Sequence, residues 1–501
     1  MTKRNKLISI LLAATMAAAS FAGCSSGGAA ESGASGAASA GAASAAGKAQ
    51  TISWYAVDSA TPADVDRVNK AASAYLQSKG LNVNLDLHIL TWTDYDTQIS
   101  TMIAAHEKFD LLNGIVSSLN NYAQSGGFVE LTGDMMSKDA PDIKSALGDD
   151  TLALTQMNGK QYVIPVNKDT ADYNGYIYNK DIAKKYNLDV SGVKSMKDWT
   201  PIFQKLHAAD SGVICYLPST FDIIVNANQM YVNGSSSLCA SIGLDNNSKT
   251  ISNYFKLSES KAVYDQLHTW YQAGYLNKDT TADTTALKNA GKVFAYPYAL
   301  KPGVAAELST GSTQWGQIEI TKAHRSIRNF PGGYATGISA SSENPDLALQ
   351  VLNMAYKDAD FLNMLVFGEK DKDYSVSDKV VTIKPNAGYN IADYSWEWGN
   401  NFLLYTTSVE AKDKWDQMKT FNDSAETLDQ TGFWFDASDY STVTTAMSNV
   451  FKQYNTQLLS GAVDVDSTLK SMNDALTSSG MDSLLDAMNK SYAAFLAAKN
   501  K

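Results

Sequence analysis

The sequence predicts an α/β fold in which a parallel sheet is covered by helices and followed by a helical C-terminal section. Strand-like and helix-like runs alternate over residues 51–116, the pattern of a parallel sheet. Two apolar stripes at helical spacing lie over residues 443–458 and 481–496. About 450 residues follow the N-terminal low-complexity tract, enough for two or three domains with real cores.

The first elements follow from local patterns. TISWYAV at 51–57 is strand-like, and Thr61-Pro62 is expected to supply a helix cap and a first-turn proline. VNLDLHIL at 83–90 alternates as a strand does, and Asp94 is expected to cap a second helix. FDLLNGIV at 109–116 is the third expected strand.

Parallel sheets bind ligands beyond the carboxyl ends of their strands. The loops expected there follow Val57, Leu90 and Val116. They should hold Asp58, Trp92 and the stretch 117–122, which begins with Ser117 and Ser118. These residues are therefore candidates for ligand contact.

The C-terminal stripes consist of methionine, leucine and aromatic residues. Stripes of this kind are more often core than cofactor site, so we interpret both as core. Gly461 is expected to end the first of these helices, and Asn344-Pro345 to begin an earlier one.

The N-terminus has the pattern of a secretory signal. A positive start precedes an apolar run over residues 7–19, which is too short for a convincing membrane span. FAGC at 21–24 resembles a bacterial lipobox, in which Cys24 is lipidated, although Phe21 stands where leucine is usual. The Ser/Gly/Ala-rich residues 25–50 are expected to form a flexible tether.

Composition excludes several function classes. A net charge of −11 argues against nucleic acid as a partner. Five scattered histidines and the absence of a Cys/His pattern predict no metal and no cofactor. Cys215 and Cys239 could form a disulfide or remain two buried thiols.

Several segments resemble the family 1 extracellular solute-binding proteins, which deliver solutes to ABC importers. They occur in the family's order over residues 51–499 and include YAQSGGFVEL, YIYNKDIAKKY, GKQYVIPV, KVFAYPYALKPG and GISASSENPDLALQVLNMAY. VFGEKDKDYSV, WEWGNNFLLY and GFWFD look like the large lipoprotein branch of that family.

The resemblance implies a two-lobe periplasmic-binding-protein-like fold with hinge strands. Lobe one would comprise residues 51–165 and 336–430, and lobe two 168–333 and 433–501, after a signal peptide at 1–24 and a tether at 25–50. The crossings would lie near Val166-Asn167, Tyr334 to Gly337, and Gly432. A solute would be trapped between the lobes.

The family's ligand contacts transfer position by position. They fall near Asp58, on Ser117 and Ser118, on Asp172 beside Tyr173, on or near Tyr298, and on Trp434. The serine pair stands where the maltose-binding protein carries charged residues, which puts maltose-like recognition in doubt. Trp92 and Trp396 are further candidates, because aromatic rings can cover the apolar face of a sugar.

The resemblance implies a monomeric solute-binding component of an ABC importer that delivers a sugar or oligosaccharide to the permease subunits. It would be lipid-anchored at the extracellular face of the cell membrane. A peptide or another nutrient is an alternative solute, and a sensor or adhesin would share the fold. A surface glycosidase would need paired carboxylates such as Asp94, Asp96, Glu397 or Asp436, but their spacing does not single them out. We predict no enzymatic activity.

Overall fold

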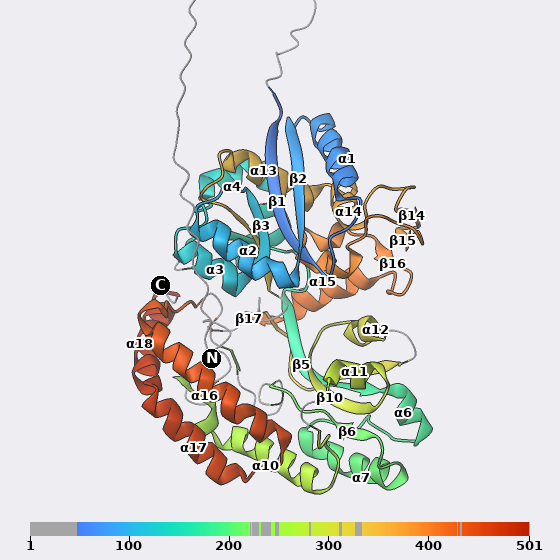
Figure 1. Ribbon diagram of the computed structural model, residues 1–501, viewed down its shortest axis with the longest axis vertical. Helices are drawn as coiled ribbons and strands as arrows, with labels where there is room; N and C mark the ends of the chain where they lie inside the picture. Colours follow the sequence, from blue (N-terminus) through green and yellow to red (C-terminus); the bar gives the residue numbers. More distant parts are fainter. Residues whose placement is uncertain are drawn as a thin grey trace, which may run out of the picture. The chain divides into compact units, whose positions relative to one another are not determined.

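The computed structural model describes residues 48–157, 159–220, 222, 230–231, 242–245, 250–279, 282–309, 313–325, 333–427, 429–430 and 433–499. Their main features are two β-sheets with their helices and a C-terminal helical section (Figure 1). Cys24, Cys239 and Gly432, which the sequence singles out, lie outside the described residues. Gln50, expected in the tether, is the first residue of a strand.

The first sheet has five strands in the order β2-β1-β3-β13-β4. Their bounds are β1 Gln50–Asp58, β2 Val83–Thr91, β3 Leu111–Ile115, β4 Val163–Pro165 and β13 Tyr334–Ile338. β1 is parallel to β2 and β3, which confirms the predicted parallel arrangement. β13 is antiparallel to both β3 and β4 and comes from a distant part of the chain.

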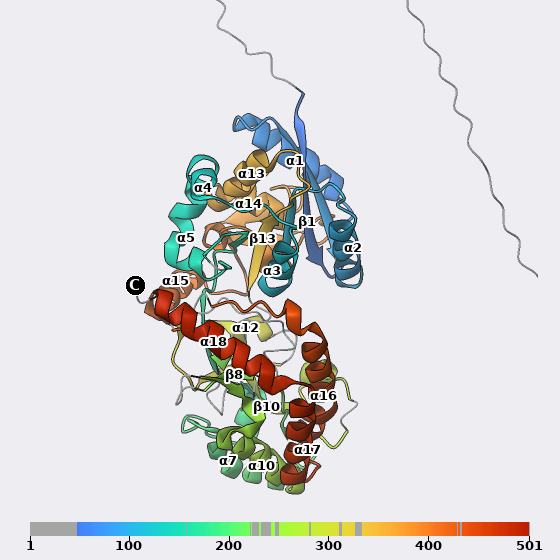
Figure 2. The same cartoon turned by 90° about the vertical axis from the view of Figure 1, so that its left-hand side faces the viewer.

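Helices cover both faces of this sheet, because successive side chains of a strand point to opposite faces. Ile52, Trp54 and Ala56 of β1 enter a larger core, whereas Tyr55 and Val57 face a smaller one. The larger core is closed by α1 Val65–Ser78, α4 Gly133–Asp139, α5 Pro141–Ala153, α13 Pro345–Lys357 and α14 Ala359–Phe367. The smaller is closed by α2 Trp92–Ala104 and α3 Val116–Gln124, on the opposite side in Figure 2.

The predicted cap of α1 is wrong. The helix begins at Val65, because the Thr61 hydroxyl donates to the Ile89 carbonyl at 2.8 Å and is not used as a cap. The start of α13 at Pro345, directly after Asn344, is confirmed.

The expected loops after β2 and β3 are also absent, since each strand runs directly into a helix. Trp92 is the first residue of α2, and Ser117 and Ser118 lie in the first turn of α3. Asp94 does not cap α2; it lies in the first turn, and the Thr91 hydroxyl donates to its carboxylate at 2.7 Å. An acidic residue there is favoured by the helix dipole.

The second sheet has the order β17-β12-β5-β10-β6, with β11 also pairing with β5. Its strands are β5 Ala171–Asn179, β6 Ile214–Tyr216, β10 Val293–Leu300, β11 Trp315–Glu319, β12 His324–Arg325 and β17 Glu426–Thr427. Helices around it are α6 Lys180–Lys185, α7 Trp199–Ala209, α10 Ser258–Gln272, α11 Thr284–Asn289, α12 Val304–Leu308 and α15 Lys414–Ser424.

Both predicted C-terminal stripes are core. The chain ends in α16 Ser441–Ser460, α17 Val465–Ser478 and α18 Met481–Lys499, which pack with α10 (Figure 1). α16 ends at Gly461, as predicted, with a φ of 72°. A Cβ at Gly461 would also lie 2.6 Å from the Leu267 carbonyl oxygen, so only glycine fits this contact with α10.

Smaller elements complete the described fold. Two three-stranded sheets consist of β7 Met230–Tyr231, β8 Ile242–Asp245 and β9 Thr250–Asn253, and of β14 Tyr374–Ser377, β15 Val380–Ile383 and β16 Thr406–Thr407. Short 3₁₀ helices are η1 Met196–Asp198, η2 Tyr254–Lys256, η3 Ala392–Glu397, η4 Asn401–Leu403 and η5 Ser438–Tyr440. Of these, η3 matters for the site.

The chain crosses from the first sheet to the second between β4 and β5. Asn167 is held on the first-sheet side, where its backbone N–H donates to the Gly399 carbonyl at 2.9 Å. The next residues belong to a chain of ion pairs on the second-sheet side, formed by Lys168, Asp169, Lys301, Glu307, Lys414 and Glu410. The chain therefore exchanges contacts with the first sheet for contacts with the second between Asn167 and Lys168.

Candidate functional site

The candidate site lies at the carboxyl edge of the first sheet. β1 ends there at Asp58, and α2 and α3 begin where β2 and β3 end. The helix η3, from much later in the chain, packs against β1 and β13. Four separate segments thus place side chains at one edge, as expected for a sheet whose parallel strands end together.

Four aromatic side chains form a continuous row there, which we call the aromatic ledge: Trp92, Tyr394, Trp396 and Tyr334. The Trp92 indole N–H donates to the Tyr394 hydroxyl at 3.0 Å, and their ring centroids are 6.3 Å apart. Tyr394 and Trp396 have centroids 5.3 Å apart, and Trp396 meets Tyr334 edge to face at 4.3 Å. Sequence reasoning found the two tryptophans and missed the two tyrosines.

The ledge is open at its Trp92 end. Trp92 is 42% exposed, whereas every other tryptophan of the described residues is buried or half-buried. Tyr394 and Trp396 are half-buried and Tyr334 is buried. A large exposed aromatic side chain that continues into a row of others is typical of a binding surface.

Two carboxyl groups lie beside the ledge at the end of β1. Asp58 is 6% exposed; its Oδ1 accepts from the Ser59 hydroxyl at 2.9 Å, and no hydrogen bond to Oδ2 occurs among the described residues. Glu397 is fully buried and accepts from the Val57 backbone N–H at 3.2 Å. Burial raises the pKa of Glu397 well above its usual value; the Val57 N–H opposes this, and Asp58 adds to it.

Three further predicted residues lie at or near this edge. Ser118 is half-buried in the first turn of α3, and the side chain of Ser117 is not among those that the structure describes. Trp434 is 7% exposed and belongs to the core that also contains Tyr95 of α2. Its neighbours Phe433 and Phe435 instead join the core of the second sheet. Trp434 therefore links the two halves of the molecule, and little of it is exposed.

The structure does not join the remaining predicted residues to the ledge. The Asp172 carboxylate lies 3.4 Å from His324 on the neighbouring strand. Tyr173 is buried against Phe421 of α15, and its hydroxyl accepts from the Gln317 amide at 3.0 Å. Tyr298 is half-buried in the same cluster. No described contact connects these three with the aromatic ledge.

A cavity of about 670 Å³ lies between α5 and α15, beside the crossing from β4 to β5, and is lined by none of the predicted ligand-contact residues. Its walls include Asn167, Asn400 and Asn422. The amide of Asn167 donates to that of Asn400 at 3.0 Å, and that of Asn422 donates to the Lys168 carbonyl at 2.6 Å. These buried amides already satisfy one another and the backbone, so we assign them to holding the chain in place where it crosses from β4 to β5.

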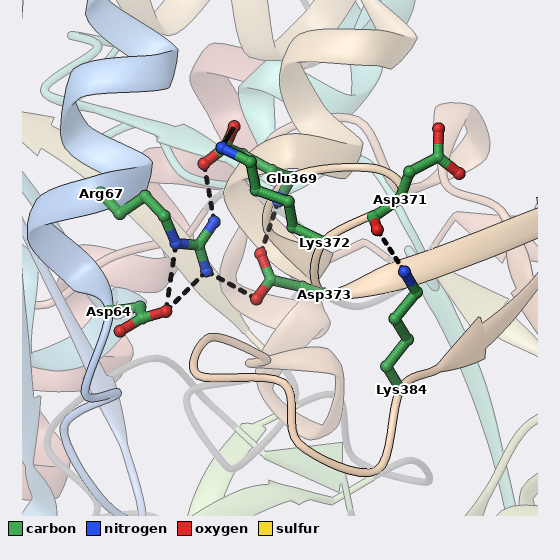
Figure 3. A network of polar contacts seen from close by, with 7 residues as sticks. All are labelled: Asp64, Arg67, Glu369, Asp371, Lys372, Asp373 and Lys384. Atoms are coloured by element: carbon green, nitrogen blue, oxygen red, sulfur yellow. Dashed lines mark hydrogen bonds and ion pairs between the residues drawn. The ribbon is translucent and has the colours of Figure 1, made fainter.

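A dense charged cluster joins α1 to the β14–β15 hairpin (Figure 3). The Arg67 guanidinium lies 2.6 Å from Asp373, 2.7 Å from Glu369 and 2.9 Å from Asp64. Asp373, which is 1% exposed, also accepts from the Glu369 backbone N–H at 2.8 Å. Its hydrogen bond to Arg67 is the main cause that raises the pKa of the guanidinium. The described charges pair with one another, and the cluster is a brace.

The described part of the chain shows no metal site, no activated thiol and no membrane-spanning helix. No cluster of three or more His, Cys, Asp or Glu side chains there could hold a metal ion. Cys215 is a buried free thiol whose pKa burial raises to about 12. Across these same residues, no helix has both the length and the apolar composition needed to cross a membrane.

Comparison with known families decides the class. The model of the family described as "Bacterial extracellular solute-binding protein" matches residues 59–360. The chain belongs to this family. The membership confirms the resemblance in the sequence motifs and gives a binding protein that works outside the cytoplasm. Residues 429–497 also match a domain of unknown function (DUF3502).

This solute-binding protein has relatives of known name and structure. A "Carbohydrate ABC transporter substrate-binding protein" of Streptococcus pneumoniae is 25% identical over 473 residues, covering 91% of this chain and 92% of that protein. The N-glycan transport solute-binding protein NgtS of the same species has a TM-score of 0.76 at 23% identity, covering 90% of this chain and 100% of that one.

The likeness to these solved solute-binding proteins over about nine-tenths of the chain confirms the two-lobe fold. NgtS in complex with Man5GlcNAc has a TM-score of 0.69 at 23% identity, covering 90% of this chain and 99% of that one. The alginate-binding protein AlgQ2 has a TM-score of 0.59 at 14% identity, covering 89% of this chain and 98% of that one.

Proposed function

We propose that this protein is the solute-binding component of an ABC importer, that its solute is an oligosaccharide, and that the aromatic ledge binds it. The row of rings at the carboxyl edge of the first sheet, open at Trp92, carries the proposal. The curated relative is named for carbohydrate transport, and NgtS was crystallised with mannose-containing glycans. Both relatives cover nearly the whole chain, so the likeness is not confined to one lobe.

The ledge suits the two kinds of surface that a sugar presents. The apolar C–H face of a pyranose ring would lie on Trp92 and Trp396, at a small entropic cost because these side chains are rigid. The Oδ2 of Asp58, which has no hydrogen bond among the described residues, and the hydroxyl of Ser118 would accept or donate hydrogen bonds at the polar rim. A pocket with aromatic walls and a few polar groups is the usual form of such a site.

The second lobe would complete the site when the lobes close. We propose Tyr298 as its main contribution and Asp172 as a secondary one, whereas Tyr173 and Trp434 would act mainly through packing. We also propose that lobe one comprises residues 51–165 and 336–413, and that α15 and β17 move with lobe two, since β17 pairs with β12 and α15 packs on the second sheet. Scattering curves that superimpose with and without saturating glycan would argue against closure.

We further propose that Cys24 carries the lipid anchor and that residues 25–47 are the tether. Two or more acyl chains give stable attachment, and a flexible tether of this length spans roughly 25–30 Å. The Cys24→Ala protein should fail to mature as a lipoprotein or be shed into the medium. Wild-type fractionation of that variant would contradict the anchor.

We propose that the solute is released unchanged to the permease. Three of the four carboxyl groups considered for hydrolysis have other surroundings or partners: Glu397 is fully buried, Asp94 accepts from the Thr91 hydroxyl, and Asp436 accepts from the Ser438 backbone N–H. A bound glycan should be recovered intact after long incubation. Steady conversion of the glycan would favour a glycosidase.

The test of the function is a thermal-shift screen of the full chain against neutral oligosaccharides, monosaccharides and short peptides. A ligand at 100 times its dissociation constant should add about 2.7 kcal/mol of stability. Stabilisation by oligosaccharides alone supports the proposal. Stabilisation by peptides alone would replace the solute class and leave the transport role in place.

A further inference from the structure

The charged groups around the aromatic ledge are all acidic in the part of the chain that the structure describes. Asp58 and Glu397 lie at the end of β1, Asp94 and Asp96 lie in α2 beside Trp92, and Asp393 precedes Tyr394 in η3. Asp58 is more than nine-tenths buried and retains one carboxylate oxygen without a described hydrogen bond. Burial raises the pKa of Glu397 and favours its neutral form, so the negative charge of the site comes from Asp58, Asp94, Asp96 and Asp393. None of these four carboxylates has a described ion pair with a cation.

The pKa directions of two tyrosines near these carboxylates, Tyr334 of the ledge and Tyr122 of α3, agree with this negative charge. Burial raises the pKa of Tyr334, and the carboxyl groups of Glu397 and Asp96 raise it further. Burial raises the pKa of Tyr122 in α3, and Asp96 adds to that shift. Among the described groups, no cation lowers the pKa of either tyrosine.

Two cations on neighbouring elements, Arg67 and Lys301, are already paired with carboxylates. Arg67 is enclosed by Asp64, Glu369 and Asp373 at the start of α1 (Figure 3). On the second sheet, Lys301 lies 3.4 Å from Asp169 and 3.2 Å from Glu307. Two cations without a described ion pair, Arg325 and Lys419, line the cavity between α5 and α15.

We propose that the site selects neutral oligosaccharides and rejects acidic ones, such as glycans that end in sialic or uronic acid. This inference rests on the proposed carbohydrate function and adds a charge requirement to it. A sugar carboxylate on the ledge would face like charges in a partly dehydrated place, where repulsion is stronger than in bulk water. A neutral sugar would find hydroxyl acceptors and aromatic faces without that repulsion.

The test is a glycan array probed with the full chain, carrying matched pairs of neutral glycans and their sialylated or glucuronylated counterparts. In about 20 mM salt, where charges are weakly screened, we expect each acidic member to bind at least tenfold more weakly than its neutral partner. The ratio should shrink in about 500 mM salt, because the Debye length then falls to a few ångströms. A discrimination caused by shape would not respond to salt.

Two variants sharpen the result. Asp96→Asn removes one charge and leaves all four ledge rings in the sequence, and it should lower the neutral-to-acidic affinity ratio at low salt. Asp134→Asn removes an exposed carboxylate on α4, on the other face of the sheet, and should leave the ratio unchanged. Acidic glycans that bind as well as their neutral partners would overturn the charge requirement while the carbohydrate function stands. An array on which no glycan binds would overturn both.

Discussion

The Arg67 cluster and the aromatic ledge lie near the carboxyl end of β1, and they differ in whether their polar and aromatic groups already have partners within the protein. In the Arg67 cluster, one guanidinium meets three carboxylates, and the central Asp373 is 1% exposed. On the aromatic ledge, Trp92 is 42% exposed and Asp58 keeps one oxygen free of described hydrogen bonds. The first cluster is closed by its own members, and the second is left open to a ligand.

The difference separates structural polarity from functional polarity. Buried charges persist where protein partners satisfy them, because an unpaired buried charge is costly. An exposed indole has no such requirement and gains most when something covers it. A search for dense charge alone would choose the Arg67 cluster as the binding site. A search for exposed aromatic side chains and for polar atoms without a described partner chooses the ledge.

The largest expected effect comes from the two tryptophans of the stretch YSWEW. Trp398 is fully buried and its ring centroid lies 5.0 Å from that of Trp54. Trp398→Ala should lower the free energy of unfolding by about 3–5 kcal/mol, the usual cost of an aromatic cavity in a core. Trp396→Ala, at a half-buried ledge position, is the matched control. Equal losses of stability in urea unfolding would contradict the assignment of one ring to the core and the other to the site.

A smaller loss is expected when the closed cluster is opened. Arg67→Met leaves Asp373 and Glu369 without their cation, and a buried pair broken on one side costs about 3–5 kcal/mol. Because the Arg67 side chain is 28% exposed, we expect a discounted loss of about 1–3 kcal/mol. Lys470→Met, which removes an ion pair with Asp474 that is exposed on both sides, should change thermal stability little. Similar unfolding midpoints for the two variants would show that the cluster is no brace.

The smallest effect is a pH dependence from Glu397. Its folded pKa is raised above the unfolded value, so the native state binds the extra proton. Stability should therefore fall as pH rises from about the unfolded pKa, near 4.3, toward the folded pKa. Glu397→Gln removes this loss and keeps an acceptor for the Val57 N–H. The stability of the variant relative to wild type should rise with pH in urea unfolding. A difference that is constant from acid to neutral pH would contradict the buried-carboxyl assignment.

The sequence predicted what depends on local pattern. The strand-like run of β1, the alternation in β2, the helical spacing of the C-terminal stripes and the Asn344-Pro345 start of α13 are each contained in a short stretch of sequence. The predicted starts of the helices that begin at Val65 and Trp92 were wrong. At the first of them, a tertiary contact decides the start, because the Thr61 hydroxyl donates to the Ile89 carbonyl on the next strand.

The site could be predicted only in part, for the same reason. Asp58 and Trp92 follow strands whose ends are readable, and Trp396 is conspicuous by its type. Tyr334 and Tyr394 reach the ledge through contacts between residues that are far apart in the sequence. Tyr334 pairs with Ile115 of β3, and the Tyr394 hydroxyl accepts from the Trp92 indole N–H. Nothing in their local sequence sets them apart from tyrosines of the core.

The most direct test of the account is a calorimetric titration of the mature protein with a neutral mannose-containing glycan such as Man5GlcNAc, in wild type and in Trp92→Ala. Trp92 is exposed, so its loss should leave thermal stability nearly unchanged. Removal of the open end of the ledge should weaken binding by about 1–3 kcal/mol, or roughly five- to 150-fold. Wild-type affinity in Trp92→Ala would contradict the claim that the aromatic ledge is the binding site.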